Sequence, residues 1–530
     1  MRSRSPAAGI AALVLPWVLL AFGAAASAAP LTVCSEGSPD GFDIQQWESA
    51  VTHDAVGNTI YDQLILYKRG TTELKPGLAE RWEVSPDGLQ FTVHLRRGVR
   101  FHTTPWFTPT REFNADDVLF SMRRMADPKS PWLATATQGF VVYTGSGMAS
   151  AVKSVEKLDP MTVRFHLTRP TAPFNYYLAY SFTGSVLSAE YGEKLLKAGT
   201  PGKINSEPVG TGPFAFRSYQ KDAVIRYAAH AGYWGGKPAV DPLIFAVTPD
   251  ANVRVQRLKA GECLVGANVK GEAYASFEGT PVKMVGGSTL LTGYIALNTQ
   301  KKFLSDQRFR EALALALDQT TYVKSVYGGR ATPAGSFMPP SQWGHDPSLK
   351  PRFDPEKAKA LVKAAGYDGT ELEIMTRIGG SIDGRRAAEL MQADWARIGV
   401  KTRVRMTEWG ELLKVSGRGQ HDITFLNWAG GGDPDDSLAP NLSCEALQAQ
   451  GNKSRWCSKP FDALLDAGRK ALDQTQRIAI YKQAQRMIYD EVPLIPTVYP
   501  NYFTAVNQRV HGFVASPTSD IDFRDVSVGP

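Results

Sequence analysis

Alternating apolar and polar residues predict two half-buried β-strands in the amino-terminal part of the chain. The apolar positions are Leu89, Phe91, Val93 and Leu95 in the first segment and Val163, Phe165 and Leu167 in the second. Between these strands, the segment NADDVLFSMRRM has the spacing of an amphipathic helix, and Asn114 is placed to cap it. This part of the chain therefore combines strands with helices.

Helical periodicity is stronger in the second half of the chain. The segment FDPEKAKALVKAAGY begins with Asp354 as a cap and Pro355 at the first helical position, and Gly366 ends it. A further helix precedes the alternating strand VKTRVRM, and its apolar face consists of Ala387, Leu390, Met391, Trp395 and Ile398. The alternation of helices and strands predicts an α/β fold with mixed sheets.

Residues 1–28 are predicted to be a secretory signal peptide. Two arginines precede the apolar run AALVLPWVLLAFGAAASA, whose small residues predict cleavage after Ala28. Pro16 within the run argues against a membrane anchor, and Val33 before Cys34 argues against lipidation. The signal peptide predicts export of the mature chain to the periplasm. No later stretch reaches the about 18 consecutive apolar residues of a spanning helix, so the mature chain is not expected to cross the membrane.

Length and charge narrow the class of protein further. A mature chain of about 500 residues is too long for one ordinary core, so at least two lobes are expected. The formal net charge is +7, and removal of Arg2 and Arg4 leaves +5. The basic residues are scattered along the chain, which argues against nucleic-acid binding.

Four cysteines, Cys34, Cys263, Cys444 and Cys457, lie in the exported part of the chain. An even number in an oxidising compartment predicts two disulfides, for which three pairings are possible. We favour Cys444–Cys457 as a short local loop and Cys34–Cys263 as a long-range link. A zinc site is disfavoured, because the sequence contains no C-x2-C motif and no pair of histidines with helical ligand spacing. No cofactor is expected.

The sequence lacks the common catalytic motifs. It contains no G-x-S-x-G, no H-E-x-x-H and no Walker loop. One S-x-x-K runs from Ser154 to Lys157, but its Ser-Asp-Asn and Lys-Thr-Gly companions are missing. An exported chain of this size without such motifs is more typical of a binding protein than of an enzyme.

An ordered set of segments resembles one family of binding proteins. In chain order they are PGLAERWEVSPDGLQFTVHLRRGVRFH, FNADDVLFSMRRM, PVGTGPFAF, GYWGGKP, TPDANVRVQRLKAGEC, RFREALALALD, PPSQWG, FDPEKAKALVKAAG and RWCSKPFDALL. They are similar to the family 5 extracellular solute-binding proteins of ABC importers, above all to periplasmic dipeptide-binding proteins. The segment PWFTPTREFNADDV also resembles the branch linked to antimicrobial-peptide resistance.

The resemblance implies a two-lobed fold of the type II, cluster C-like kind, with a hinge and a ligand enclosed between the lobes. The first lobe would comprise residues 29–62, 210–290 and 507–530, the inserted domain 63–209, and the second lobe 291–506. The disulfides of the family match the pairing favoured above. The expected function is that of a monomer that passes short peptides to a membrane permease with its ATPases. Haem, nickel chelates and aminolevulinate are alternative ligands, and an exported hydrolase is the alternative class.

The loop NWAGGGDPDDSLAPNLSC departs from the dipeptide-binding relatives. In those proteins, an aspartate after the tryptophan that matches Trp428 binds the α-ammonium group of the peptide. Here Gly430, Gly431 and Gly432 occupy that place, the loop is one residue shorter, and Asp433 is the first acid. Two hypotheses follow. Asp433 binds the ammonium group through a charge-assisted hydrogen bond, or it caps a helix or turn and the amine is not recognised.

The carboxylate of a peptide needs a cation at the other end of the site. Arg377 is the best candidate for the arginine that precedes the matching helix in the relatives, although its spacing to that helix differs by one residue. Its planar fork suits a carboxylate, and the alternative is a surface residue at a strand end. Trp409 resembles a pocket-lining tryptophan, with core packing as its alternative. Ile378, Gly379 and Gly380 replace bulkier residues of the relatives, so together with the glycine triplet they predict a roomier or differently shaped pocket.

Overall fold

The structure is a computed structural model that describes residues 29–529 apart from 48, 137–138, 268, 270, 379–383 and 449. The predicted signal peptide and the glycines at 379 and 380 lie outside the described residues. No helix in the described part of the chain has both the length and the apolar character needed to cross a membrane.

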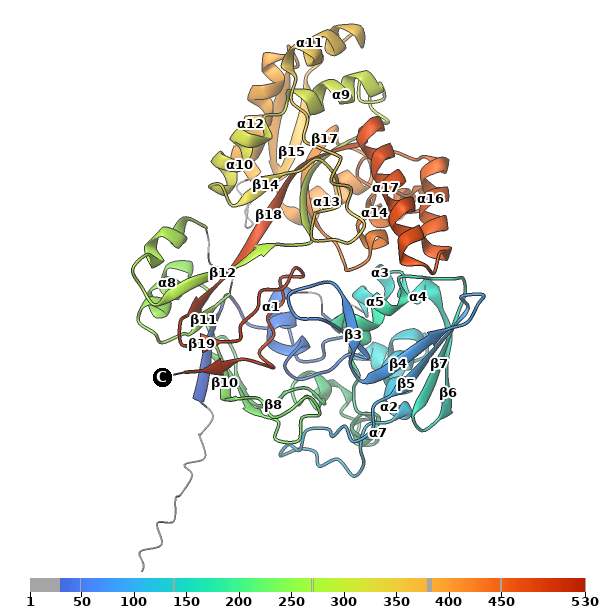
Figure 1. The fold of residues 1–530 in the computed structure, drawn as a ribbon, viewed down its shortest axis with the longest axis vertical. Coiled ribbons are helices and arrows are strands. Elements are labelled where there is room, and N and C mark those ends of the chain that lie inside the picture. The colour runs from blue at the N-terminus through green and yellow to red at the C-terminus, as the bar shows by residue number, and fades with distance from the viewer. Residues whose placement is uncertain are drawn as a thin grey trace, which may run out of the picture.

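A twelve-stranded sheet runs through the molecule, and most of its strands follow the order β16-β15-β17-β13-β18-β11-β1-β10-β9-β8 (Figure 1). Its strands are β1 (Ala29–Ser35), β8 (Phe214–Gln220), β9 (Val224–Ala229), β10 (Val240–Val247), β11 (Val265–Gly266), β12 (Val282–Ser288), β13 (Leu291–Leu297), β14 (Ala331–Pro333), β15 (Leu372–Arg377), β16 (Thr402–Thr407), β17 (Ile423–Ala429) and β18 (Leu494–Asn507). Both β12 and β14 pair with β18. The pattern of parallel and antiparallel pairs confirms the mixed sheet predicted from the sequence.

The molecule has two lobes, which Figure 1 shows one above the other. We call the lower one, with β1 to β12 and the carboxyl-terminal segment, the first lobe, and the upper one, with β13 to β17, the second lobe. Strand β18 crosses from one to the other, and the link between β12 and β13 crosses beside it, where the Thr289 hydroxyl donates to the Pro500 carbonyl at 3.0 Å. The residue boundaries of the lobes and of the inserted domain stay predictions.

The first lobe holds a second, four-stranded sheet in the order β4 (Ala79–Val84), β5 (Gln90–Leu95), β7 (Thr162–Leu167), β6 (Val152–Asp159). The predicted strands are confirmed, since Phe91 pairs with Phe165 and both are buried. Other elements of this lobe are α1 (Ala50–Thr52), α2 (Ala115–Ala126), α3 (Val141–Gly145), α4 (Met148–Ala151), α5 (Phe174–Ala179), α6 (Ser181–Gly184), α7 (Ala189–Lys197), α8 (Ala251–Lys259), β2 (Ile65–Tyr67), β3 (Leu74–Pro76), β19 (Val510–His511) and β20 (Ser527–Val528). Asn114 caps α2 as predicted, and Asp117 completes a capping box.

Helices flank the sheet of the second lobe. They are α9 (Gln307–Ala316), α10 (Gln319–Tyr327), α11 (Pro355–Ala364), α12 (Gly384–Arg397), α13 (Trp409–Gly417), α14 (Pro434–Leu442), α15 (Cys444–Gln448), α16 (Lys459–Lys470) and α17 (Gln474–Glu491). Asp354 caps α11 as predicted, and Trp395 on α12 is fully buried in the core. The apolar face of α12 therefore packs against β15 and β16, whereas α11 packs against α9.

Two disulfides link Cys34 to Cys263 and Cys444 to Cys457, which confirms the favoured pairing. None of the cysteines in the described residues is free. The first bridge joins β1 to the segment just before β11 within the first lobe, and the second closes a short loop between α15 and α16.

Candidate ligand-binding site

Three neighbouring strands of the second lobe end at the sheet edge that faces the first lobe. Strands β16, β15 and β17 are parallel and adjacent, and their last residues are Thr407, Arg377 and Ala429. In open α/β sheets, ligands bind outside the carboxyl ends of such strands. The predicted site residues Arg377, Trp409 and the glycine triplet all lie at or just beyond these ends.

Arg377 and Trp409 lie against each other at this edge. The guanidinium carbon of Arg377 is 4.7 Å from the centre of the Trp409 ring, a cation–π contact that fixes the direction of the side chain. The Nε atom of Arg377 is buried without a hydrogen-bond partner, and no carboxylate of the described residues lies within ion-pair distance of this arginine. Trp409 is 37% exposed, so it is not a core residue. The geometry leaves the guanidinium available, and its ligand role stays a prediction.

Each glycine of the triplet is closely approached by another side chain. A β-carbon on Gly430 would collide with the hydroxyl of Ser437, and one on Gly431 with the carboxylate of Asp436. A β-carbon on Gly432 would lie 2.6 Å from the ring of Tyr176, which belongs to the first lobe. The space left by the absent side chains is thus filled by protein, so these glycines allow close packing and do not enlarge the pocket.

Asp433 is fully buried inside the second lobe. It is the amino-terminal cap of α14, and its carboxylate accepts a hydrogen bond from the Asp435 backbone at 3.0 Å. Both of its oxygens also accept hydrogen bonds from Arg477, at 2.7 and 2.8 Å. This is the helix-cap arrangement of the second hypothesis. A role of Asp433 in binding a ligand stays a prediction, and it would require this ion pair to break.

Asp436 lies in the first turn of α14 and was not among the predicted site residues. The two acids before it are ion-paired with arginines of α16 and α17, whereas no cation of the described residues lies within 4.0 Å of Asp436. Burial, followed by the charges of Asp433 and Asp435, raises the pKa of Asp436 well above its usual range. Burial and then Asp436 also raise the pKa of Tyr67 in the first lobe. The Asp436 carboxylate therefore lies near the first lobe.

The lobes touch each other beside this loop. The Tyr67 and Tyr176 rings of the first lobe have centres 6.3 Å apart, and both rings pack next to Gly432 of the second lobe. Beside them, the backbone N–H of Ala172 in the first lobe donates to the carbonyl oxygen of Arg469 in the second lobe at 2.9 Å. The tyrosines have no periodic signal in the sequence that could have identified them. This contact joins the two lobes next to Gly432.

Gln342 holds the glycine loop in place from inside the second lobe. Its amide nitrogen donates to the carbonyl oxygens of Gly431 at 3.0 Å and Asp433 at 2.9 Å, and its amide oxygen accepts from Ser437 at 2.9 Å. The segment PPSQWG, which contributed to the family resemblance, contains this residue and was the available signal for it.

Comparison with known proteins identifies the family of this chain. The family model described as bacterial extracellular solute-binding proteins, family 5 Middle, matches residues 73–448. The chain is 47% identical to di/tripeptide-binding protein 4 of Pseudomonas aeruginosa (strain UCBPP-PA14). The matched region of 525 residues covers 98% of each of the two chains.

Two solved structures share the fold over nearly the whole chain. HbpA2 from Haemophilus parasuis has a TM-score of 0.89 at 37% identity, over 94% of this chain and 100% of that one. A dipeptide-binding protein from Pseudoalteromonas sp. SM9913, solved with Met-Leu, has a TM-score of 0.80 at 32% identity, again over 94% and 100%. This chain therefore belongs to the family 5 bacterial extracellular solute-binding proteins and has their two-lobed fold.

Proposed function

We propose that this protein binds short peptides of the di- and tripeptide class between its lobes and delivers them to the permease of an ABC importer. The ligands named for its relatives support this class. The observation that carries the proposal is a guanidinium and a carboxyl group beyond the ends of neighbouring strands, Arg377 and Asp436, each without an ion-pair partner among the described residues. A zwitterionic peptide would place its carboxylate on Arg377 and its ammonium group on Asp436.

In this proposal the protein acts as a periplasmic monomer without catalysis. The peptide stabilises the closed arrangement of the lobes, and the permease with its ATPases recognises that arrangement. The lobes would have the boundaries given by the resemblance, with an inserted domain at residues 63–209. Recovery of the intact peptide after incubation with the pure protein distinguishes this function from that of an exported hydrolase.

Asp436→Asn should weaken binding of the dipeptide Ala-Ala about ten- to a hundredfold, because loss of a charged hydrogen-bond partner costs about 1.5–3 kcal/mol. N-acetyl-Ala-Ala has no ammonium group, so the same substitution should not change its weak binding. Calorimetry with both ligands measures the difference. Asp490→Asn, which removes an exposed acid of the second lobe, is the matched control. If the native protein and Asp436→Asn bind Ala-Ala equally well, Asp436 does not bind the ammonium group. If the native protein binds no di- or tripeptide, the proposed function is wrong.

Dipeptide affinity should also rise with pH. Because burial, Asp433 and Asp435 raise the pKa of Asp436, this side chain keeps its proton above the usual carboxyl range and must lose it to bind an ammonium group. Affinity is therefore low below that pKa and increases as the pH passes through it. Tyr67 and Tyr176, which lie beside Gly432, have raised pKa values and stay neutral in this pH range. The pH dependence should disappear in Asp436→Asn, and a flat profile in the native protein would contradict the assignment.

Gly432→Ala should weaken peptide binding by keeping the lobes apart. The added methyl group would lie 2.6 Å from the Tyr176 ring and 2.9 Å from that of Tyr67. Overpacking of this kind costs about 1–3 kcal/mol, which corresponds to roughly five- to 150-fold in affinity. Small-angle scattering with saturating Ala-Ala should give a larger radius of gyration than for native protein. Adding Tyr176→Leu to Gly432→Ala should restore closure, whereas a fully closed single variant would show that this contact does not limit closure.

A further inference from the structure

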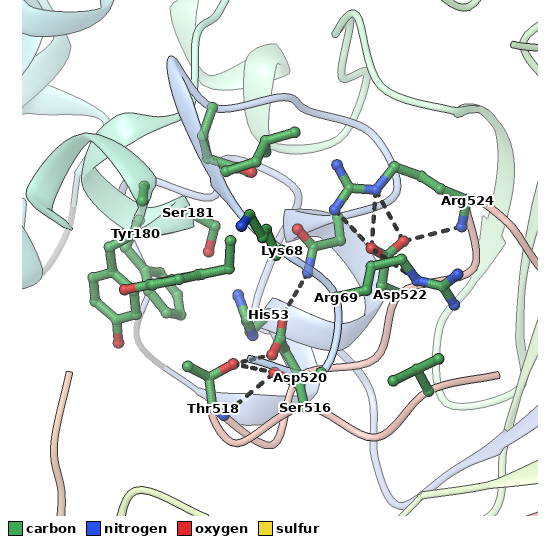
Figure 2. Close-up of a pocket in the computed structure, with 18 of the residues that line it drawn as sticks. His53, Lys68, Arg69, Tyr180, Ser181, Ser516, Thr518, Asp520, Asp522 and Arg524 are labelled. Carbon is green, nitrogen blue, oxygen red and sulfur yellow. Dashed lines mark hydrogen bonds and ion pairs between the residues drawn. The ribbon is translucent and has the colours of Figure 1, made fainter. Parts of the chain in front are cut away.

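A cavity of about 190 Å³ lies in the first lobe beside the contact between the lobes (Figure 2). Residues 50–70, 179–182 and 514–524 contribute its walls. At about 30 Å³ for each water molecule, it has room for about six waters. Tyr67 lines this cavity, and its ring also lies beside Gly432 of the second lobe. The cavity is therefore adjacent to the proposed peptide site and separate from the sheet edge that carries Arg377.

The charges around the cavity leave one carboxylate without an opposite charge. The three cations of the wall have their own acids: Lys68 with Glu73 at 2.6 Å, Arg69 with Asp525 at 3.1 Å, and Arg524 with Asp522 at 2.7 Å. Figure 2 shows the Arg69, Asp522 and Arg524 group on one side of the cavity and Asp520 apart from it. Among the described residues, no cation lies within 4.0 Å of Asp520.

Neutral groups hold the Asp520 carboxylate in place. Asn58 donates to it at 2.7 Å, and the Thr518 hydroxyl also donates to it. Burial lowers the pKa of the neighbouring His53 although Asp520 opposes that shift, so His53 is neutral at pH 7 and does not balance the charge. This carboxylate can therefore accept a charge-assisted hydrogen bond from a cation that enters the cavity.

Ser181 gives independent evidence for a ligand in the same cavity. It is 3% exposed, and its hydroxyl oxygen has no hydrogen-bond partner in the described part of the chain. Buried hydroxyl groups are nearly always paired, so this one calls for a partner that enters the cavity. The ring of Phe182 stacks on His53 with centres 5.2 Å apart, and with Tyr67 it forms an apolar wall beside these polar groups.

We propose that this cavity binds the cationic side chain of a lysine- or arginine-containing peptide. The inference rests on the proposed function, because the peptide backbone would lie in the site between the lobes. The aliphatic stem would pack against the aromatic wall of Tyr67 and Phe182, and the charged end would donate to Asp520 and to the Ser181 hydroxyl. The protein would then prefer basic dipeptides over apolar ones of the same length.

Calorimetry with Ala-Lys and Lys-Ala, each compared with the peptide that has norleucine in place of lysine, tests this preference. Norleucine keeps the aliphatic chain and removes the ammonium group. We expect native protein to bind one of the lysine peptides about ten- to a hundredfold more tightly than its norleucine counterpart. Asp520→Asn should reduce that ratio to about one, whereas the charge-matched control Asp490→Asn should keep it.

A second variant tests the contribution of the cavity volume independently of the Asp520 charge. Ser181→Leu retains Asp520 and fills the space, so it should weaken binding of both lysine and norleucine peptides relative to Ala-Ala. If native protein binds Ala-Ala but does not prefer lysine over norleucine, the inference is wrong and the proposed function stands. A preference that survives in both Asp520→Asn and Ser181→Leu would also overturn the inference. If no dipeptide binds at all, the proposed function fails and the inference fails with it.

Discussion

Replacing both Cys34 and Cys263 with alanine should lower the free energy of unfolding of the first lobe by about 5 kcal/mol. The two cysteines are 229 residues apart, so the disulfide removes a large amount of chain entropy from the unfolded state. It also joins β1, at the centre of the first-lobe sheet, to the segment that precedes β11. Denaturant unfolding of the native protein and the double variant, without reductant, measures the loss.

The second disulfide provides the matched control. Cys444 and Cys457 are only 13 residues apart, so replacing both should cost about 3 kcal/mol by the same estimate. Reductant should destabilise the native protein as much as the substitutions do together. Equal losses from the two double variants would show that loop length in the unfolded state does not set the stabilisation.

Asp433→Asn should destabilise the second lobe by about 3–5 kcal/mol, because it leaves the Arg477 guanidinium buried without its counter-charge. The side chains of Asp433 and Arg477 are 0% and 6% exposed and are joined by two hydrogen bonds. Denaturant unfolding followed by tryptophan fluorescence measures the effect. Combining Asp433→Asn with Arg477→Met removes both charges and should recover most of the lost stability.

An exposed acid of the same region serves as the control. The Asp466 side chain is 62% exposed and lies 3.5 Å from Arg469, so Asp466→Asn should cost less than about 1 kcal/mol. If Asp433→Asn is as stable as the native protein, Arg477 does not depend on Asp433. The hypothesis that Asp433 binds the peptide ammonium group would then regain its support.

Local signals in the sequence predicted much of the fold. Asn114 and Asp354 cap helices as expected, because a cap depends on residues within one turn. The alternating strand around Phe91 is present, since its period records which face is buried. The expectation of two lobes followed from the chain length, and the favoured disulfide pairing, which the resemblance to the family matched, is the one that the structure contains.

The candidate site was harder to predict because its decisive contacts are distant in sequence. Asp433 is neutralised by Arg477, 44 residues away, and no local pattern distinguishes it from Asp436. The glycine triplet predicted a roomier or differently shaped pocket, and the structure contradicts the first alternative, because Tyr176 of the other lobe closes on Gly432. A glycine marks where a side chain is absent, and the sequence does not state what occupies the space.

The shared strand β18 has a mechanical consequence for this protein. Along its length β18 is hydrogen-bonded first to β13 and β14 of the second lobe and then to β12 of the first lobe. The lobes are therefore joined by a hydrogen-bonded β-ribbon and not by a free linker. Opening must therefore twist an elastic sheet, whose restoring force favours one resting angle. A substitution in this ribbon could shift that angle, and with it the strength of peptide capture, without altering any atom that touches the peptide.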